Sequence, residues 1–522
     1  MAAIGKPLIS KPLISQPSPQ AVWATLRKDW LIKLEDGQNH LQHPLAALSC
    51  ESWFSLVESR RIQLTQRSDK QLKNKQPKTE QPKTERPLVL LAESDPVHFL
   101  AGFWAALLAD WDITLANPHW GTQEWASVSQ LIHPTVIWSD PSGPIITAFN
   151  GPHQTLRPQP NPLAKILIPT GGTSGSVKLT CHSWATLLTA VTGFQNHFAP
   201  DGSTINSYCV LPLYHVSGLM QALRTWHSGG QLVIGHFKSL LSYPLSKLEA
   251  PSLPQLDNSF ISLVPTQLTR LMQSGFAPWL SQFRGVLLGG APPWPSLLTR
   301  AKAHGIPLCL SYGMTETAAM VTAQRTQDFL QGDLSSGHMM PHATVRIEQE
   351  GQGLRDGSVG QVVVCSGAIA HNYHNAPSKR FHTGLSTNAF YTDDLGYLDT
   401  DGQLHITGRA SRKIISGGEN IFPDEVEAKL RDTGQVADVY VLGLPHPDWG
   451  EIVTAVYVPA TKSITPTQLK DCLLTADQQL SRYKIPQQWI ALPALPRNAQ
   501  GKLNHAALIE QLSAQKLNGA SD

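Results

Sequence analysis

The sequence predicts an α/β protein in which a large N-terminal domain of stacked sheets and helices precedes a smaller α+β domain. Short apolar runs that are typical of buried strands alternate with longer helical segments over most of the chain. After Gly408 this alternation changes to a compact stretch of helices and strands. A chain of 522 residues is also too long for one ordinary domain. We therefore expect a large domain over 1–408 and a small domain over 409–522.

The large domain is predicted to contain two segments without a folding pattern of their own. Residues 1–20 include a tandem duplication with prolines, and 71–86 include a second, polar one. Such repeats are too short to fold by themselves, so we expect a flexible tail and a solvated loop. An Ala-rich helix is expected over 96–110. Strands are expected at 87–91, 135–138, 165–169, 207–211, 231–234 and 285–288.

The small domain is predicted to mix helices and strands. A helix is expected to start at 425–431, and strands are expected at 437–442 and 454–458. A second helix should follow, with Thr465 as its N-cap and Pro466 in its first turn, because both residue types are favoured there. We expect this helix to end near Leu480.

The charge balance and the cysteines restrict the possible functions. The chain has 41 basic and 39 acidic residues, so it lacks the basic excess of a nucleic-acid binder. Its 6 cysteines lie far apart without C-x-x-C spacing, which argues against a disulfide framework and a zinc site. No apolar run has the length of a membrane span or the form of a signal peptide. We expect small-molecule partners and a cytoplasmic location, while the oligomeric state stays open.

A Gly-rich loop follows the strand expected at 165–169 and is a candidate for binding the phosphates of a nucleotide. Glycines let the backbone approach an anion, hydroxyls supply donors, and a lysine adds a fixed charge. The loop is not a Walker A motif, because Ser176 and Val177 separate its last glycine from the lysine. Taken alone, it is equally consistent with a surface turn. Its candidate residues are Thr170, Gly171, Gly172, Thr173, Ser174, Gly175 and Lys178.

Four further motifs occur downstream in a fixed order. They are Ser311–Thr317, Tyr391–Gly396, Gly408-Arg409 and Pro496–Lys502. Together with the Gly-rich loop they resemble the adenylate-forming superfamily, which includes acyl-CoA synthetases, peptide-synthetase adenylation domains and luciferases. The resemblance covers roughly residues 88–505. It implies the adenylate-forming enzyme fold and an enzyme that uses ATP and Mg²⁺ to activate a carboxylic acid as an acyl-adenylate, which then reacts with coenzyme A.

The resemblance implies roles for the charged residues of these motifs. Because a carboxylate and ATP repel each other, positive groups are needed between them, and Lys178, Arg409 and Lys502 would supply these. Glu316 resembles the acid that organises Mg²⁺, and Thr315 resembles the hydroxyl that donates to the α-phosphate. Lys502, Glu316 and Thr315 are therefore candidate catalytic residues.

The resemblance also places residues around the adenosine. Asp394 resembles the carboxylate that binds both ribose hydroxyls, which suits its two acceptor oxygens. Tyr312 resembles the ring that packs on adenine. Outside this pattern, Asp394 could be a turn residue and Glu316 could cap a helix. The other ATP contacts that the resemblance implies are Gly289, Gly290, Ala291, Gly313 and Met314.

The segment Leu211–Leu219, followed by Arg224, indicates the acid that is activated. It resembles the acyl pocket of 2-succinylbenzoate:CoA ligases of the menaquinone and phylloquinone pathways. That aromatic substrate has a second carboxylate, which a guanidinium can bind through two hydrogen bonds. The alternative is that Arg224 is a charge on a helix surface. The residues placed at the substrate are His215, Ser217, Arg224 and Gly290.

Two of these expectations leave alternatives open. His215 is a further catalytic candidate, as a gate or a hydrogen-bond partner of the reacting carboxyl, but it could equally be a buried core histidine. The chain could also be another acyl- or aryl-CoA ligase, or an adenylate-binding homologue without turnover.

The thioester step is expected to use a second loop and a domain movement. The resemblance assigns this step to Ser416, Gly417, Gly418 and Glu419. The small domain would present Lys502 for adenylation and then rotate to offer this loop, with a hinge near Ser411.

Overall fold

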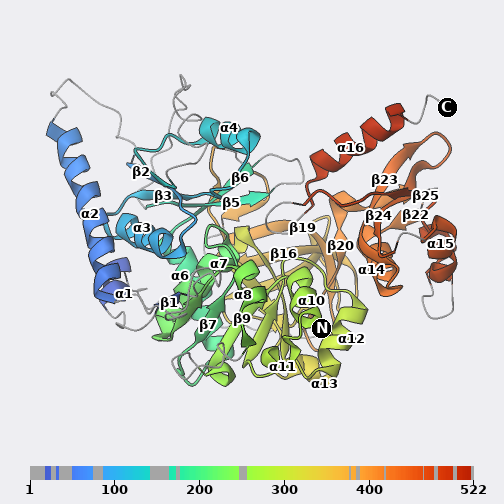
Figure 1. The fold of residues 1–522 in the computed structure, drawn as a ribbon, viewed down its shortest axis with the longest axis horizontal. Coiled ribbons are helices and arrows are strands. Elements are labelled where there is room, and N and C mark those ends of the chain that lie inside the picture. The colour runs from blue at the N-terminus through green and yellow to red at the C-terminus, as the bar shows by residue number, and fades with distance from the viewer. Residues whose placement is uncertain are drawn as a thin grey trace, which may run out of the picture.

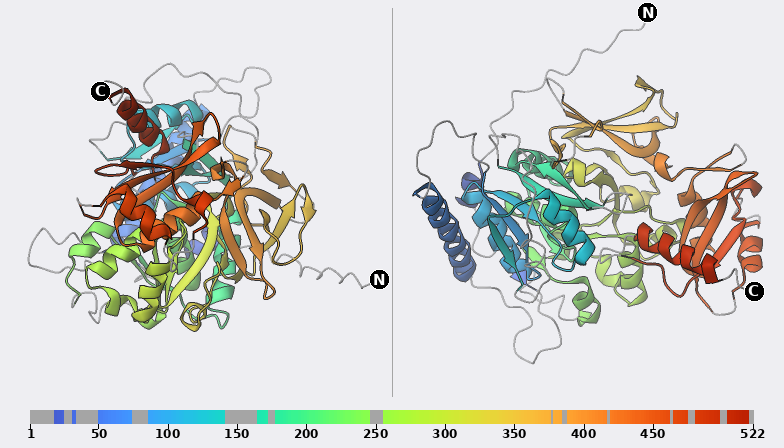
Figure 2. Two further views of the ribbon diagram at one scale, coloured as in Figure 1. Left: turned by 90° about the vertical axis from the view of Figure 1, so that its right-hand side faces the viewer. Right: turned by 90° about the horizontal axis from the view of Figure 1, so that it is seen from above.

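The chain folds into a large layered body with a smaller body at one end (Figure 1). The computed structural model describes residues 18–24, 31–33, 50–73, 86–140, 164–171, 177–245, 255–375, 378–383, 388–416, 419–461, 464–474, 480–497 and 503–518. The small body contains the elements after β20 and lies opposite helix α2 in both Figure 1 and Figure 2. The predicted fold class, a large α/β domain with a small α+β domain, is confirmed. The boundary between 408 and 409 stays a prediction.

One sheet of six strands holds the Gly-rich loop between two of its strands. Its order is β17-β6-β5-β3-β2-β4, with β5, β3, β2 and β4 parallel and β6 and β17 antiparallel to their neighbours. Strand β2 is buried at every position, as its apolar run predicts. The bounds are β2 Leu88–Ala92, β3 Asp112–Leu115, β4 Val136–Ser139, β5 Ile166–Gly171, β6 Val177–His182 and β17 Asn372–Tyr373.

A second sheet of eight strands forms the centre of the large domain. Its order is β1-β8-β7-β9-β10-β11-β12-β13, parallel from β1 to β11 and antiparallel beyond. The bounds are β1 Leu31–Lys33, β7 Asn206–Cys209, β8 Leu232–Ile234, β9 Ser259–Leu263, β10 Gly285–Leu288, β11 Leu308–Met314, β12 Ala319–Ala323 and β13 His338–Met339. Because parallel strands end at one edge, the segments after β7, β10 and β11 lie near one another.

A third sheet, which the sequence analysis did not predict, is antiparallel throughout. Its order is β15-β14-β16-β19-β18, and β20 pairs with β19. The bounds are β14 Ala343–Gln349, β15 Gln352–Gly353, β16 Gly360–Ser366, β18 Phe381–Thr383, β19 Asn388–Leu398 and β20 Leu404–Arg409. It carries both Asp394 and Arg409 into the site described below.

Helices cover the sheets of the large domain. Asp95 caps α3 by accepting hydrogen bonds from the backbone N–H groups of Val97 and His98, and Pro96 occupies the first turn. The bounds are α1 Pro19–Ala24, α2 Cys50–Lys73, α3 Pro96–Leu108, α4 Thr122–Leu131, α6 Trp184–Phe198, α7 Val216–Ser228, α8 Phe237–Ser242, η1 Leu256–Asn258, α10 Pro265–Gln273, α11 Ala277–Leu280, α12 Pro295–Ala303, η2 Thr315–Thr317 and α13 Asp328–Gln331. Within the described residues, no helix is long and apolar enough to cross a membrane.

The small domain has its own sheet and its own core. The sheet order is β22-β21-β24-β23, with β25 parallel to β24. Val426 and Leu430 of α14 and Leu469 of α15 are fully buried against it. The bounds are η3 Ala410–Arg412, β21 Ile414–Ser416, β22 Glu419–Ile421, α14 Pro423–Asp432, β23 Val436–His446, β24 Gly450–Pro459, α15 Pro466–Leu474, η4 Arg482–Lys484, β25 Gln488–Ala491 and α16 His505–Asn518.

Some predicted boundaries were wrong. Helix α1 starts at Pro19, inside the expected tail over 1–20, of which 1–17 lie outside the described residues. Helix α2 continues to Lys73, because its last turns consist of good helix formers, so 71–73 are not part of a loop. Arg86, at the end of that expected loop, is held by ion pairs to Asp110 and Asp112. Helix α15 is described up to Leu474 and 475–479 lie outside the described residues, so its predicted end near Leu480 stays a prediction.

The N-terminus of α12 in the large domain contacts the C-terminus of α14 in the small domain. Helix α12 has Trp294 at its N-cap, which provides no side-chain cap. Instead the N–H of Ser296 donates to Asp432 Oδ1 over 2.9 Å, so the small domain caps a helix of the large one. Beside this bond, the Arg431 guanidinium lies 5.7 Å from the centre of a Trp294 ring.

An aromatic cluster stabilises the large domain, and its centre is Trp104. This side chain is fully buried and its ring lies 4.4 Å from that of Trp226, 5.4 Å from that of Trp23 and 5.8 Å from that of Trp184. We expect Trp104→Ala to destabilise the domain by about 3–5 kcal/mol, because it leaves a large cavity. Thermal unfolding followed by circular dichroism measures this. Trp449→Ala, at a tryptophan that is 49% exposed, is the control, and an equal loss in both variants would contradict the prediction.

Candidate active site

The strands on either side of the Gly-rich loop form an antiparallel hairpin. Thr170 of β5 pairs with Lys178 of β6, and Gly171 pairs with Val177. The Lys178 ammonium lies 5.3 Å from the centre of the Tyr373 ring. The hairpin thus holds the lysine at the base of the loop. The predicted residues Gly172, Thr173, Ser174 and Gly175 lie outside the described residues.

The turn η2 carries Thr315 and Glu316 directly beside this hairpin. The Thr315 carbonyl accepts a hydrogen bond from Nε2 of His182, the last residue of β6, over 2.8 Å. Glu316 is only 8% exposed, and its Oε1 accepts a hydrogen bond of 2.7 Å from the Tyr373 hydroxyl. The structure therefore brings together Lys178, Thr315 and Glu316, which the sequence predicts to act on one triphosphate.

The backbone after η2 is held in an unusual conformation. Ala318 and Ala319 have φ values of 53° and 83°, the left-handed region that alanine rarely adopts. The Thr317 hydroxyl fixes this turn through the carbonyl of Ala319, 2.8 Å away. Gly313 runs so close to it that a Cβ would lie 1.9 Å from the Ala319 oxygen. The turn that follows Glu316 is thus tightly determined.

Asp394, Tyr312 and Arg409 form a second cluster of predicted residues. Asp394 Oδ2 accepts a 2.7 Å hydrogen bond from the Tyr312 hydroxyl, and Oδ1 accepts one of 2.9 Å from Arg409 Nε. Burial, with the Asp394 charge beside it, raises the pKa of Tyr312 well above its usual value, so its hydroxyl stays a donor. Each carboxylate oxygen keeps a further lone pair, so the group can still accept from a vicinal diol.

The turn after β10 lies beside Ser311, the residue before Tyr312. A Cβ on Gly289 would lie 3.1 Å from Oγ of Ser311. Gly290 has a φ of 81°, which favours glycine. Ala291 follows it, and Met314 ends β11 opposite Ala319.

Arg224 lies on α7 and is buried, with an exposure of 4%, which rules out a helix-surface charge. Its guanidinium donates to Ser262 Oγ over 2.9 Å and lies 4.2 Å from the centre of the Phe194 ring. Its Nε has no partner, and among the described residues no carboxylate pairs with the guanidinium. Burial lowers its pKa, which means that the charge is poorly compensated.

A narrow cavity adjoins this guanidinium. The cavity is lined by Arg224, Phe194, Ala190, Met220, Ala319 and Met340, among others. Ala319 belongs to the turn after Glu316, so the cavity lies between the buried guanidinium and this turn.

His215 and Ser217 lie at the start of α7. His215 is the N-cap residue and is half-buried, with its ring 4.7 Å from that of Tyr214. It is therefore not a fully buried core histidine. Ser217 is exposed and is not among the residues that line the Arg224 cavity.

The residues expected to act in the thioester step lie on a hairpin of the small domain. Ser416 of β21 pairs with Glu419 of β22, and Ser416 is buried whereas Glu419 is exposed. The predicted residues Gly417, Gly418 and Lys502 lie outside the described residues. Ser411 is exposed in η3, and its hydroxyl donates to the Asp393 carboxylate.

The donor set around Glu316 fits a magnesium ion better than other metals. Within the described part of the chain, no group of three or more His, Cys, Asp or Glu side chains could hold a metal. Mg²⁺ keeps several waters and binds through one or two carboxylates together with phosphate oxygens. A single buried carboxylate such as Glu316, next to the predicted triphosphate site, fits that requirement.

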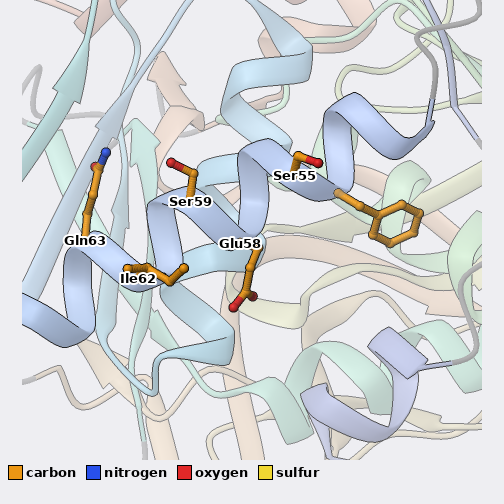
Figure 3. A pocket seen from close by; sticks show the side chains of 6 residues that line it. Ser55, Glu58, Ser59, Ile62 and Gln63 are labelled. Carbon is orange, nitrogen blue, oxygen red and sulfur yellow. The ribbon is translucent and has the colours of Figure 1, made fainter.

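A wide, shallow hollow lies elsewhere, along one face of α2 (Figure 3). Its side chains are Phe54, Ser55, Glu58, Ser59, Ile62 and Gln63, all from one helix. Glu58 already pairs with Arg61 of the same helix. Since α2 is on the side of the molecule opposite the small domain, this hollow is separate from the motifs described above.

Comparison with known proteins agrees with this geometry. The family model of the AMP-binding enzymes matches residues 49–374, and the model of the AMP-binding enzyme C-terminal domain matches residues 425–502. The chain belongs to the AMP-binding enzyme family. The superfamily predicted from the motifs is therefore confirmed, and the match begins before residue 88, so that it includes α2.

Several similar proteins are named 2-succinylbenzoate–CoA ligase. A 2-succinylbenzoate–CoA ligase of Enterococcus faecalis (strain ATCC 700802 / V583) is 31% identical over 374 residues, which are 69% of this chain and 73% of that protein. One of Bacillus anthracis (strain A0248) is 31% identical over 350 residues, 65% of this chain and 68% of that protein.

Solved structures of the o-succinylbenzoate CoA synthetase MenE from Bacillus subtilis share the fold. The complex with the acyl-adenylate intermediate OSB-AMP has a TM-score of 0.75 at 24% identity and covers 94% of this chain and 98% of that chain. The complex with ATP and magnesium has a TM-score of 0.74 at 23% identity and covers 95% and 99%.

Four residues that contact the predicted site were not predicted from the sequence. Tyr373, His182, Ser262 and Phe194 touch Glu316, Thr315 or Arg224. His182 could have been noticed, because it ends the strand that follows the Gly-rich loop. The other three come from distant segments and stand in no recognisable pattern.

Buried histidines at this site make the stability of the chain depend on pH. Burial lowers the pKa of His182 to about 4, and it does the same for His342 and His374. Between about pH 6.5 and 4 the unfolded chain binds protons that the folded chain does not, so acid lowers the free energy of unfolding. For His182 alone we expect a loss of about 2 kcal/mol between pH 7 and about pH 5.

Thermal unfolding at both pH values measures this effect. His182→Gln should reduce the difference between them, whereas His98→Gln, at an exposed histidine, should leave it unchanged. The prediction is wrong if both variants keep the dependence of the parent.

Proposed function

We propose that this chain activates 2-succinylbenzoate as an acyl-adenylate and transfers the acyl group to coenzyme A, a reaction of menaquinone or phylloquinone biosynthesis. The observation that carries the proposal is Arg224, a buried cation without a carboxylate partner among the described residues, beside a small cavity that Ala319 of the turn after η2 also lines. A second carboxylate on the substrate would compensate this charge. The relatives named above as 2-succinylbenzoate–CoA ligases support the choice of acid.

The reaction class follows from the family to which the chain belongs. The AMP-binding family and its CoA-ligase relatives confirm the predicted class, an AMP-forming acid–thiol ligase with ATP and CoA as co-substrates and Mg²⁺ as the metal. The cytoplasmic location expected from the sequence stays a prediction.

The charged residues have different roles in adenylation. In our proposal Lys178, Arg409 and Lys502 neutralise the charge that develops when the carboxylate attacks the α-phosphate. Thr315 would donate to that phosphate, and Glu316 would hold the magnesium ion, which would supply positive charge to the phosphates. Each of these roles needs a fixed position, which β6 and η2 provide for Lys178, Thr315 and Glu316.

The remaining residues bind and exchange the substrates. Asp394 accepts from the ribose hydroxyls while Tyr312 and the turn Gly289–Ala291 border the adenine. His215, at the cap of α7, borders the reacting carboxyl. In the thioester step the small domain rotates near Ser411 and offers the hairpin of Ser416 and Glu419 to the adenylate.

A screen for pyrophosphate release tests the function directly. The purified chain is given ATP, Mg²⁺ and a panel of carboxylic acids, with and without coenzyme A. We expect 2-succinylbenzoate to give the fastest release. A faster reaction with fatty or simple aryl acids would indicate another acyl-CoA ligase, and ATP binding without release on any acid would indicate a homologue without turnover.

The role of Arg224 is tested by removing its charge. We expect Arg224→Leu to raise the Michaelis constant for 2-succinylbenzoate by at least about tenfold, since a charge-assisted hydrogen bond of about 1.5–3 kcal/mol is lost. Benzoate-type acids, which lack the distal carboxylate, should be affected little. Arg300→Leu, at an exposed arginine of α12, is the control. An equal loss on both kinds of acid would refute the assignment.

A further inference from the structure

Tyr373 joins two charged residues of opposite sign that come from separate motifs. Its hydroxyl donates to Glu316 Oε1 over 2.7 Å, and its ring lies 5.3 Å from the Lys178 ammonium. Tyr373 is buried, with an exposure of 8%. None of the four adenylate motifs contains this residue, and it lies far from both partners in the sequence.

The backbone around Tyr373 is fixed to both motifs. Tyr373 pairs with Thr180 of β6, two residues after Lys178. The N–H of Ala370 donates to the carbonyl of Glu316 over 2.8 Å. The ring therefore has a defined place between the Gly-rich hairpin and η2, and an edge contact with Phe381 at 5.0 Å restricts its rotation.

A neutral ring between these charges has a specific consequence. Lysine and glutamate side chains that are free to move would pair with each other, and each would then be less available to a phosphate or a metal ion. A phenol has a proton to donate but carries no charge, so Tyr373 orients the Glu316 carboxylate without neutralising it. Within the described part of the chain, Lys178 and Glu316 form no ion pair, although both contact Tyr373.

We propose that Tyr373 is a positioning residue that holds Glu316 through its hydroxyl and Lys178 through its ring, so that the two charges stay apart and available for a magnesium-bound triphosphate. This inference rests on the roles proposed above for Lys178 and Glu316. It adds that the hydroxyl and the ring of Tyr373 have different effects on binding. The hydroxyl governs the response to Mg²⁺, and the ring governs the response to ATP.

Two substitutions separate these parts. Tyr373→Phe keeps the ring and removes the hydroxyl, so we expect the Mg²⁺ concentration for half-maximal binding of ATP to rise about threefold to tenfold, with little change in ATP affinity at saturating Mg²⁺. Tyr373→Leu also removes the ring, and we expect ATP affinity at saturating Mg²⁺ to fall about threefold or more. Titration calorimetry of ATP binding at several Mg²⁺ concentrations measures both without any acid present.

A matched control is available in Tyr208. Its hydroxyl is buried and has no hydrogen-bond partner among the residues that the structure describes, so Tyr208→Phe removes the same group on β7, outside η2. We expect this variant to keep the Mg²⁺ dependence of the parent. Circular dichroism and the thermal midpoint show whether each variant is folded.

Three results would overturn the proposal. The Mg²⁺ dependence of Tyr373→Phe could equal that of the parent, or it could change no more than that of Tyr208→Phe. Alternatively, Tyr373→Phe and Tyr373→Leu could weaken ATP binding equally at every Mg²⁺ concentration, which is the result of a purely structural role. Because no acid is used, a failure of the proposed acid specificity in the pyrophosphate screen leaves this test unaffected.

Discussion

The acyl side of this site depends on one constraint, a buried cation that has no carboxylate partner in the described part of the chain. Removing a guanidinium from water costs several kcal/mol unless hydrogen bonds and opposite charge replace the hydration. Ser262 and the face of Phe194 replace only part of it. The guanidinium of Arg224 stays away from solvent because its helix, α7, is fixed in place where Trp226 packs on Trp104 of the aromatic core. Core packing thus keeps a charge in a place where a bound anion would stabilise it.

On the nucleotide side of the site, neutral side chains hold negative charges. Here two carboxylates, Glu316 and Asp394, are each held by a tyrosine hydroxyl at 2.7 Å, from Tyr373 and Tyr312 respectively. A neutral donor orients a carboxylate and leaves its charge in place, whereas a lysine at the same position would cancel it. Both acids therefore remain able to bind a cation or hydroxyl groups. Asp394 also pairs with Arg409 over 2.9 Å, whereas Glu316 has no cationic partner among the described residues.

Much of this could be predicted from the sequence, because local chemistry determines it. The apolar run at 165–169 predicted β5, the strand before the Gly-rich loop, and the order of the motifs drew attention to Glu316, Asp394 and Arg409. The sequence could not indicate which face of α7 Arg224 occupies, since helical spacing alone suits a surface position equally well. Nor could it reveal Tyr373, which reaches Glu316 only because β17 pairs with β6. Contacts of this kind arise from the pairing of distant strands, and no local pattern encodes them.

The contact between the domains suits the movement that we propose for the thioester step. The first turn of α12 is capped by Asp432 of the small domain, so a rotation must exchange this hydrogen bond for water. A charge-assisted hydrogen bond contributes about 1.5–3 kcal/mol when buried and less at a partly exposed place such as this. Ligands that differ in affinity for two orientations by a few kcal/mol can reverse their populations. A hydrogen bond of this strength therefore would not by itself prevent the proposed movement.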